Sequence, residues 1–188
     1  ILAHLELAQG ALTAAGYEVE EVAVPSITPA AKAWFDVALL EIKEGLDPLA
    51  REHGSQTIQN IFDYYYQMSD TVDYKGYMKG VGDRSGIIRP WNVFLQDYPL
   101  VLTPFLMRST YDYDHDETFE GSKDLFDSAI YSYGINYMGL PAGVVPTGLI
   151  EDRPSAVQIV GQRFREDLIL DALEVIEAAV GVLSPRLW

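Results

Sequence analysis

The 188-residue sequence contains no cysteine and only three histidines. Without cysteine the chain forms no disulfide and offers no thiolate ligand to a metal. No apolar run approaches the roughly 20 residues that a transmembrane helix needs, and the first residues lack the basic segment that opens a signal peptide. These features give the expectation of a cytoplasmic protein that does not enter a membrane.

Basic residues are also scarce, because 13 Lys and Arg stand against 28 Asp and Glu, for a formal net charge of −15. Nucleic acids and anionic membrane surfaces bind clustered Lys and Arg, so we expect neither as a partner. In contrast, 48% of the residues are hydrophobic and 12% are aromatic, which is enough for a folded core. At this length a single compact domain is the default expectation.

Hydrophobic spacing predicts the order of helices and strands. Helices are expected over 2–15 with Gly16 at the end, from Pro29, from Pro48, and over 56–69, 89–96, 124–137 and 169–180. Strands are expected at 17–25, 98–104, 142–147 and 155–160, with the last two paired antiparallel across a loop of about seven residues. This alternation predicts an α/β fold in which a mixed β-sheet is covered by helices.

The start of the sequence favours a longer parent polypeptide. The helical pattern begins at Ile1, with no initiator methionine and no N-cap residue ahead of it. Helices usually begin at a side chain that caps the first free N–H groups. We therefore expect the 188 residues to be the C-terminal piece of something longer.

Five sequence segments carry a family resemblance. They are ALTAAGYEVEEVAVP, DYPLVLTP, NYMGLPAGVVPTG, RPSAVQIVGQRFRED and LEVIEAA, and the most specific part runs from Gly139 to Pro146 and continues over Ala156–Gly161. In order and approximate spacing they resemble the C-terminal half of amidase signature enzymes. Residues 1–188 are therefore expected to form the C-terminal portion of an amidase signature domain, with the N-terminal catalytic half absent.

The resemblance implies cleavage or transfer at the C–N bond of a small-molecule amide, with no cofactor. In that family a Lys acts as base on a Ser in a cis peptide, which relays the proton of a second, nucleophilic Ser. This chain has no Ser-Ser and no Gly-Gly pair, and Ser85 in GDRSG fits neither that motif nor the G-x-S-x-G elbow. We expect Ser85 in a turn, assign no catalytic residue, and expect the chain alone to be inactive.

Four side chains are candidates for a substrate pocket, namely Trp91, Phe105, Met107 and Tyr65. Loops at strand ends commonly build ligand sites, and Tyr65 belongs to an aromatic band that lies either in the core or against an acyl group. Plain packing is the alternative for all four. Gln158 has apolar neighbours, so we expect its amide to be buried and hydrogen-bonded, either to the backbone or in a pocket.

We expect residues 109–123 to form a loop, and its acidic part YDYDHDETFEG places alternating aspartates over 112–116 like the start of a calcium loop. Glu117 replaces the required Gly and Lys123 replaces the required Glu, so no metal is assigned to this loop or to His115. A calcium-binding module is a weaker alternative, and a non-catalytic binding or accessory module that keeps half of the fold is a stronger one. Exposed sheet surface would also favour self-association of the isolated chain.

Overall fold

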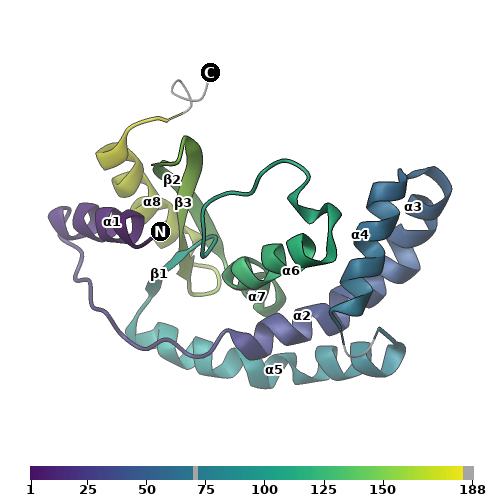
Figure 1. The fold of residues 1–188 in the computed structure, drawn as a ribbon. Coiled ribbons are helices and arrows are strands. Elements are labelled where there is room, and N and C mark those ends of the chain that lie inside the picture. The colour runs from purple at the N-terminus through teal and green to yellow at the C-terminus, as the bar shows by residue number, and fades with distance from the viewer. Residues whose placement is uncertain (70–71, 184–188) are drawn as a thin grey trace. The chain divides into compact units, whose positions relative to one another are not determined.

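The computed structural model describes residues 1–69 and 72–183 (Figure 1). The chain divides into two compact units. Unit 1 consists of Ile1–Ser26, Arg89–Thr110 and Gly139–Trp188, and unit 2 consists of Ile27–Ile88 and Tyr111–Met138. Each unit has its own arrangement of elements and its own core.

Unit 1 is built on a three-stranded sheet in the order β1-β3-β2. The strands are β1 (Leu100–Pro104), β2 (Ala142–Ile150) and β3 (Arg153–Gly161). The predicted antiparallel pair of 142–147 with 155–160 is confirmed, because these residues lie opposite each other in β2 and β3. The α/β class is confirmed as well. The prediction of a mixed sheet does not hold for the described strands, because β1 enters beside β3 in the opposite direction and both pairs are antiparallel.

The connection between β2 and β3 is shorter than the predicted loop of about seven residues. Glu151 and Asp152 form a turn with φ of 52° and 62°, the left-handed values that a two-residue hairpin turn of this kind requires at both central positions. A longer loop was expected because the apolar runs end at Thr147 and resume at Ser155, with a Gly- and charge-containing stretch between them. Between Pro146 and Gly148 the register shifts at a bulge.

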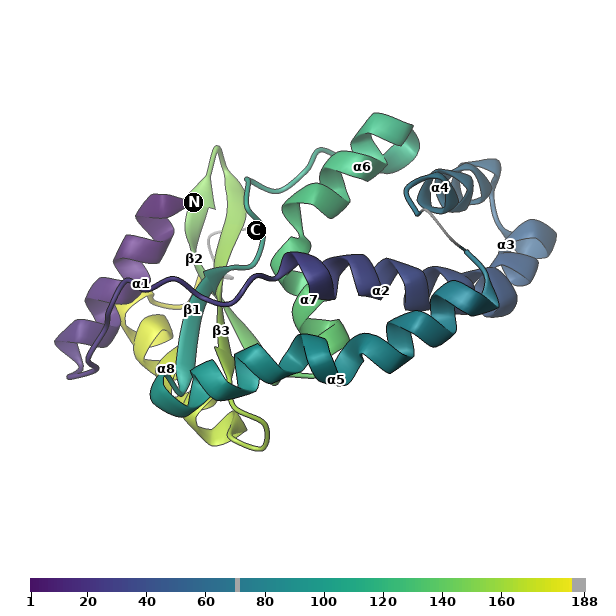
Figure 2. The ribbon, with the colours of Figure 1, turned by 90° about the horizontal axis from the view of Figure 1, so that it is seen from below.

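Two helices cover one face of the sheet in unit 1, namely α1 (Leu2–Ala14) and α8 (Glu166–Val180) (Figure 2). Their buried residues form one aliphatic core with the sheet: Ala8, Leu12, Val145, Val157, Ile159, Ile169, Ala172 and Ile176. Both helices end as predicted, since Gly16 and Gly181 follow them with φ of 98° and 81°, a region that favours glycine.

Residues 17–25, which were predicted to form a strand, have no regular secondary structure. Tyr17 and Val19 pack against the aliphatic core, and Glu18 and Glu20 between and after them are exposed. No described residue makes a backbone hydrogen bond with 18–24. A strand needs a neighbour whose N–H and C=O groups complete its ladder, so a strand-like composition was not sufficient here.

Unit 2 is helical. Its elements are α2 (Thr28–Glu41), the π-helical turn η1 (Ile42–Leu46), α3 (Asp47–His53), α4 (Gln56–Gln67), the 3-10 turn η2 (His115–Glu117), α6 (Phe119–Ser128) and α7 (Ile130–Met138). The helices predicted from Pro29, from Pro48 and over 56–69 are confirmed, with both prolines in the first helical turn. The single helix predicted over 124–137 is instead two helices.

The longest helix, α5 (Tyr74–Asp97), contains the boundary between the two units. Residues 89–96 are helical as predicted, but the helix is longer than expected because it already begins at Tyr74, and the predicted turn at Ser85 is wrong because Ser85 lies inside α5. The glycines and the proline of this segment are poor helix formers, but such propensities are weak and context overrides them. Within residues 1–69 and 72–183, no helix combines the length and apolarity that crossing a membrane requires.

Candidate functional site

The carboxyl end of β1 leads into the loop that holds two of the candidate pocket residues. Phe105 is half-buried and Met107 is 47% exposed. The end of this loop is fixed to the β2–β3 hairpin, because Thr110 Oγ1 donates to the carbonyl of Pro154 at 2.7 Å and Arg153 donates to the carbonyl of Thr110 at 3.0 Å. The sequence did not predict these bonds, since they join residues that are distant along the chain.

A buried polar pair lies on β1 and β3 close to this loop. Gln158 is 3% exposed, and its Nε2 donates to Thr103 Oγ1 at 3.2 Å. The two residues are opposite each other in the strand register. The expectation that Gln158 is buried and hydrogen-bonded is confirmed, but its partner is a side chain on the neighbouring strand and not the backbone. The only signal for Thr103 was its place near the end of an apolar strand.

Trp91, the third candidate, lies in the part of α5 that belongs to unit 1. It is 1% exposed, and its Nε1 has no hydrogen-bond partner among the described residues. Buried indole N–H groups usually have a partner because an unpaired one is costly. Trp91 is therefore a core residue in the part of α5 that leads into β1.

Tyr65, the fourth candidate, lies on α4 in unit 2, within a cluster of aromatic rings. Its ring meets that of Phe126 edge to face, with centroids 4.8 Å apart. The rings of Trp34, Phe35 and Tyr133 lie 5.8, 4.9 and 5.8 Å from Phe126. Burial raises the pKa of Tyr65, and it raises the pKa of Tyr133 to about 12. Both phenols are therefore neutral at neutral pH.

The four candidates thus fall into two groups. Trp91, Phe105 and Met107 belong to unit 1, and Tyr65 belongs to unit 2. That all four residues line one substrate pocket stays a prediction.

The segment 109–123, expected to be a loop, contains η2 and the start of α6. His115 Nε2 lies 2.9 Å from Asp124 Oδ2, and the ring of Tyr111 stacks on the imidazole at 4.8 Å. Thr118 caps α6 by accepting the N–H of Gly121 at 3.1 Å. In the described part of the chain, no three His, Cys, Asp or Glu side chains gather as a metal site would require.

Serine and lysine do not form a catalytic arrangement around Ser85. This serine is exposed on α5, and no hydrogen bond joins it to a lysine in the described residues. Lys79 is paired with Asp83, and Lys123 with Asp127, each one helical turn away. A serine becomes a nucleophile only with a base in hydrogen-bond reach, so the described residues supply no activated serine at this position.

The chain is similar to part of several longer curated proteins, although no protein-family model matches it. An indoleacetamide hydrolase of Bradyrhizobium diazoefficiens is 35% identical over 191 residues, which cover all of this chain and 36% of the relative. A glutamyl-tRNA(Gln) amidotransferase subunit of Pediococcus pentosaceus is 24% identical, over 92% of this chain and 40% of the relative. The chain therefore spans well under half the length of these relatives.

The chain has the same fold as part of several solved structures. A 6-aminohexanoate cyclic dimer hydrolase has a TM-score of 0.75 and 21% identity, covering 97% of this chain and 41% of that protein. A bacterial aryl acylamidase of the amidase signature enzymes family has a TM-score of 0.72 and 20% identity, covering 94% of this chain and 39% of that protein. The sequence relationship to a hydrolase of amides and the shared fold agree with each other, and the chain belongs to the amidase signature family.

Proposed function

We propose that the chain is the C-terminal portion of an amidase that, as an intact protein, hydrolyses the C–N bond of a small amide. The observation that carries this proposal is the 35% identity to indoleacetamide hydrolase along the whole chain, with only 36% of that relative covered. The Ser-Ser-Lys residues are placed in the part that these 188 residues do not span. This portion contributes the sheet and a share of the pocket.

For the substrate we propose an arylacetamide, and for the reaction hydrolysis in place of transfer to a second substrate. The support is the name of the 35% identical relative, since the amidotransferase relative is more distant at 24%. Aromatic and thioether side chains suit an aryl group, so we assign Trp91, Phe105, Met107 and Tyr65 to its pocket. The acidic composition supports a cytoplasmic protein without nucleic-acid or membrane partners, and no cofactor is invoked.

The test compares two proteins, the 188-residue chain and a polypeptide of the relatives' length that contains it. Ammonia release from indole-3-acetamide is expected for the longer polypeptide and not for the chain alone, because removing a catalytic triad typically costs about a millionfold in kcat. Absence of turnover in both proteins would favour the non-catalytic module. Turnover by the chain alone that disappears in Ser85→Ala would make Ser85 the catalyst and contradict the proposal.

The pocket assignment is tested in the longer polypeptide with Phe105→Ala and Met107→Ala. Lost contact with an aryl group that is equal in ground and transition state raises KM more than it lowers kcat. A severalfold rise in KM is expected for each variant. The control is Val93→Ala, which removes a 55% exposed side chain of unit 1. Equal KM values in all three variants would remove both residues from the pocket.

A further inference from the structure

The loop over residues 105–110 of unit 1 is attached to β3 at both of its ends. At the start of the loop, Pro104 lies opposite Val157 in the strand register. At its end, Thr110 Oγ1 donates to the carbonyl of Pro154 at 2.7 Å. Along the loop, Thr110 is six residues from Pro104. Along β3, Pro154 is only three residues from Val157. The loop is therefore longer than the stretch of β3 between its attachment points, and its middle must arch away from the strand.

A second hydrogen bond holds the end of the loop through its backbone. Arg153, the first residue of β3, donates from Nη1 to the carbonyl of Thr110 at 3.0 Å. Thr110 is thus bonded to two consecutive residues of β3, once by its side chain and once by its carbonyl. Hydrogen bonds from a charged donor are stronger than those between neutral groups, and the guanidinium holds its donors in a fixed plane. Arg153 is therefore the stronger of the two attachments.

The hairpin end that carries Arg153 is itself well determined. Glu151 and Asp152 form the two-residue turn directly before it, and the type and length of such a turn fix the register of the strands on either side. Thr147 Oγ1 also donates to the carbonyl of Ser155 at 3.4 Å, and both residues are buried. A loop that contains no helix or strand of its own is thus held by a rigid part of the sheet.

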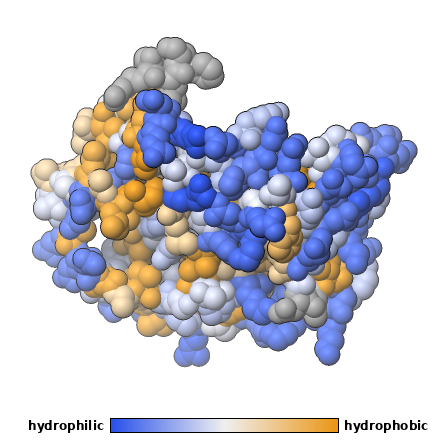
Figure 3. Space-filling view, in the orientation of Figure 1, coloured by the Kyte–Doolittle hydropathy of each residue, from blue (hydrophilic) through white to orange (hydrophobic). Residues whose placement is uncertain are grey.

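Between its two attachments the loop presents two pocket candidates, Phe105 and Met107. Phe105 is half-buried and Met107 is exposed. Hydrophobic side chains also reach the surface elsewhere in unit 1, over α8 and β2 (Figure 3), so exposure alone does not distinguish this loop. What distinguishes it is that its apolar side chains stand on a backbone held at both ends. A site that is ordered in advance loses less conformational entropy when a ligand binds.

We propose that Arg153 is a positioning residue of the amidase, because its bond to Thr110 holds the loop that brings Phe105 and Met107 against the aryl group of the substrate. The inference rests on the proposed function, since it concerns the pocket assigned there. Arg153 acts through the loop and does not touch the substrate. Its loss therefore weakens binding of the substrate and leaves the nucleophile, which lies outside these residues, unchanged.

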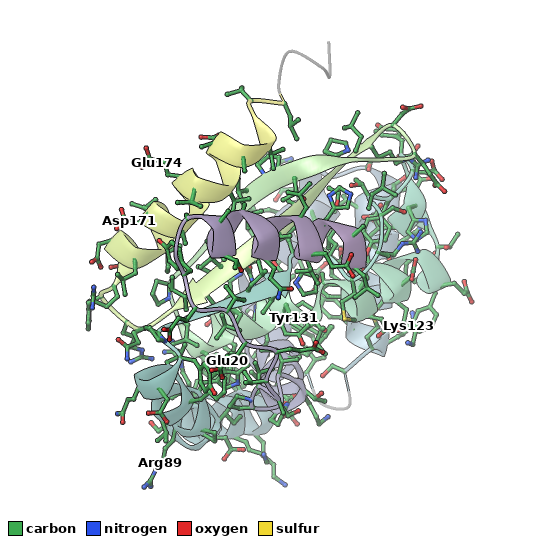
Figure 4. All side chains as sticks on the ribbon, turned by 90° about the vertical axis from the view of Figure 1, so that its left-hand side faces the viewer. Glu20, Arg89, Lys123, Tyr131, Asp171 and Glu174 are labelled. Carbon is green, nitrogen blue, oxygen red and sulfur yellow. The ribbon has the colours of Figure 1, made fainter. Side chains whose placement is uncertain are left out.

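The first test is Arg153→Ala in the longer polypeptide. Because a hydrogen bond from a charged group is lost, KM for indole-3-acetamide is expected to rise about tenfold while kcat changes less than about twofold. The matched control is Arg89→Ala, since Arg89 is also an arginine of unit 1, and its side chain is exposed and points outward from α5 (Figure 4). An unchanged KM in Arg153→Ala, or equal effects of the two variants, overturns the proposal.

Thr110 offers a milder pair of variants that keeps Arg153 in place. Thr110→Val retains the shape of the side chain but removes the hydroxyl that donates to Pro154, whereas Thr110→Ser retains the hydroxyl. KM is expected to rise severalfold in the valine variant and to stay close to the wild-type value in the serine variant. Equal KM values in the two variants would show that substrate binding does not depend on how the loop is held, which contradicts the proposal.

A double-mutant cycle separates positioning from a general loss of stability. If Arg153 acts through the loop, Met107→Ala has little left to remove once the attachment is gone. The double variant should then raise KM by no more than about twofold beyond Arg153→Ala alone. Independent residues would instead multiply their effects on KM. A full product of the two single effects overturns the proposal, because Arg153 would then act somewhere other than the loop.

Tryptic cleavage after Arg108 measures the freedom of the loop without any turnover, since Arg108 lies between the two attachments. When opening and closing are fast, the cleavage rate follows the population of the open form. Cleavage after Arg108 in the longer polypeptide is therefore expected to be about tenfold faster in Arg153→Ala. Cleavage after Arg163, which is exposed between β3 and α8, is the internal reference. Equal rates after Arg108 in the wild type and the variant overturn the proposal.

The outcomes also distinguish this inference from the proposed function. Turnover by the longer polypeptide with an unchanged KM in Arg153→Ala rejects this inference alone. If the longer polypeptide shows no turnover, calorimetry measures its binding of indole-3-acetamide instead. A dissociation constant that rises about tenfold in Arg153→Ala then supports the positioning role and rejects only hydrolysis. Absence of binding by the wild type as well rejects both.

Discussion

The two units differ in how much aromatic rings contribute to their packing. In unit 1, aliphatic residues of the sheet, α1 and α8 interlock, and β-branched side chains suit the rows of a pleated sheet. In unit 2, rings of Trp34, Phe35, Tyr65, Phe126 and Tyr133 meet at 4.8 to 5.8 Å. Unit 2 also buries aliphatic side chains such as Leu39, Leu40 and Ile135, so its rings add to an aliphatic core and do not replace it. The difference indicates that single rings contribute more to unit 2, whereas the core of unit 1 relies on close aliphatic packing.

The largest effect is expected for Phe126→Ala, which removes a ring that contacts four others in unit 2. Loss of a buried Phe side chain typically costs about 3–5 kcal/mol. Urea unfolding followed by circular dichroism measures the free energy of unfolding. Tyr113→Ala is the control, since Tyr113 is 94% exposed and its removal should change little. A cost below that of Ile159→Val in unit 1, about 0.5–1.5 kcal/mol, would contradict the comparison.

A smaller effect is expected when one methyl group is added to unit 1. In Gly161→Ala the new Cβ would lie 2.9 Å from two atoms of Ile169, which is 3% exposed and has no open space to enter. Overpacking of this kind costs about 1–3 kcal/mol. In Gly86→Ala the new Cβ meets no atom within 4 Å, so the gain in helix propensity stabilises α5 by up to about 1 kcal/mol. Equal signs for the two substitutions would refute close fit as the cause.

The polar pair of unit 1 should contribute a similar or smaller amount. Thr103→Val keeps the shape of the side chain but leaves the buried amide of Gln158 without its hydroxyl partner. An unsatisfied buried group costs about 1–3 kcal/mol. Thr103→Ser, which keeps the hydroxyl, is the matched control and should cost less. If the serine variant is the less stable one, the methyl group and not the hydrogen bond matters at this position.

The smallest effect concerns pH. Burial lowers the pKa of His4 below its usual 6.5, and His4 Nδ1 lies 2.8 Å from Thr147 Oγ1. The unfolded chain therefore binds the proton more readily, so the contribution of His4 to stability is present above about pH 6.5 and decreases as the pH falls toward its folded pKa. His4→Gln should reduce the loss of stability between pH 7.5 and 5.

Local sequence signals were sufficient where neighbouring residues alone determine the structure. The helix ends at Gly16 and Gly181 and the helix starts at Pro29 and Pro48 follow from single-residue geometry, and the β2–β3 pair follows from alternating apolar runs. The same signals failed at 17–25, where the pattern of a strand is present and the partner is not. They also failed over 74–88, where no helix was expected and Ser85 was placed in a turn.

The sequence predicted less of the candidate site than of the fold. The burial of Gln158 followed from its apolar neighbours, but its partner Thr103 depends on the β1–β3 register. The bonds of Thr110 with Pro154 and Arg153 likewise join distant segments. Such contacts are set by topology, which a local pattern does not specify. The pocket assignments of Trp91, Phe105, Met107 and Tyr65 stay predictions.

The strand order also has a consequence for the order of folding. β2 and β3 are neighbours in the chain and share a two-residue turn, and isolated hairpins of this kind close in about 1–10 μs. β1 must find β3 from far away, since Leu100 pairs with Gly161, and such distant pairings carry the entropic cost of closing a large loop. During synthesis β1 therefore leaves the ribosome before its partner exists, and it must avoid premature association until the hairpin has formed.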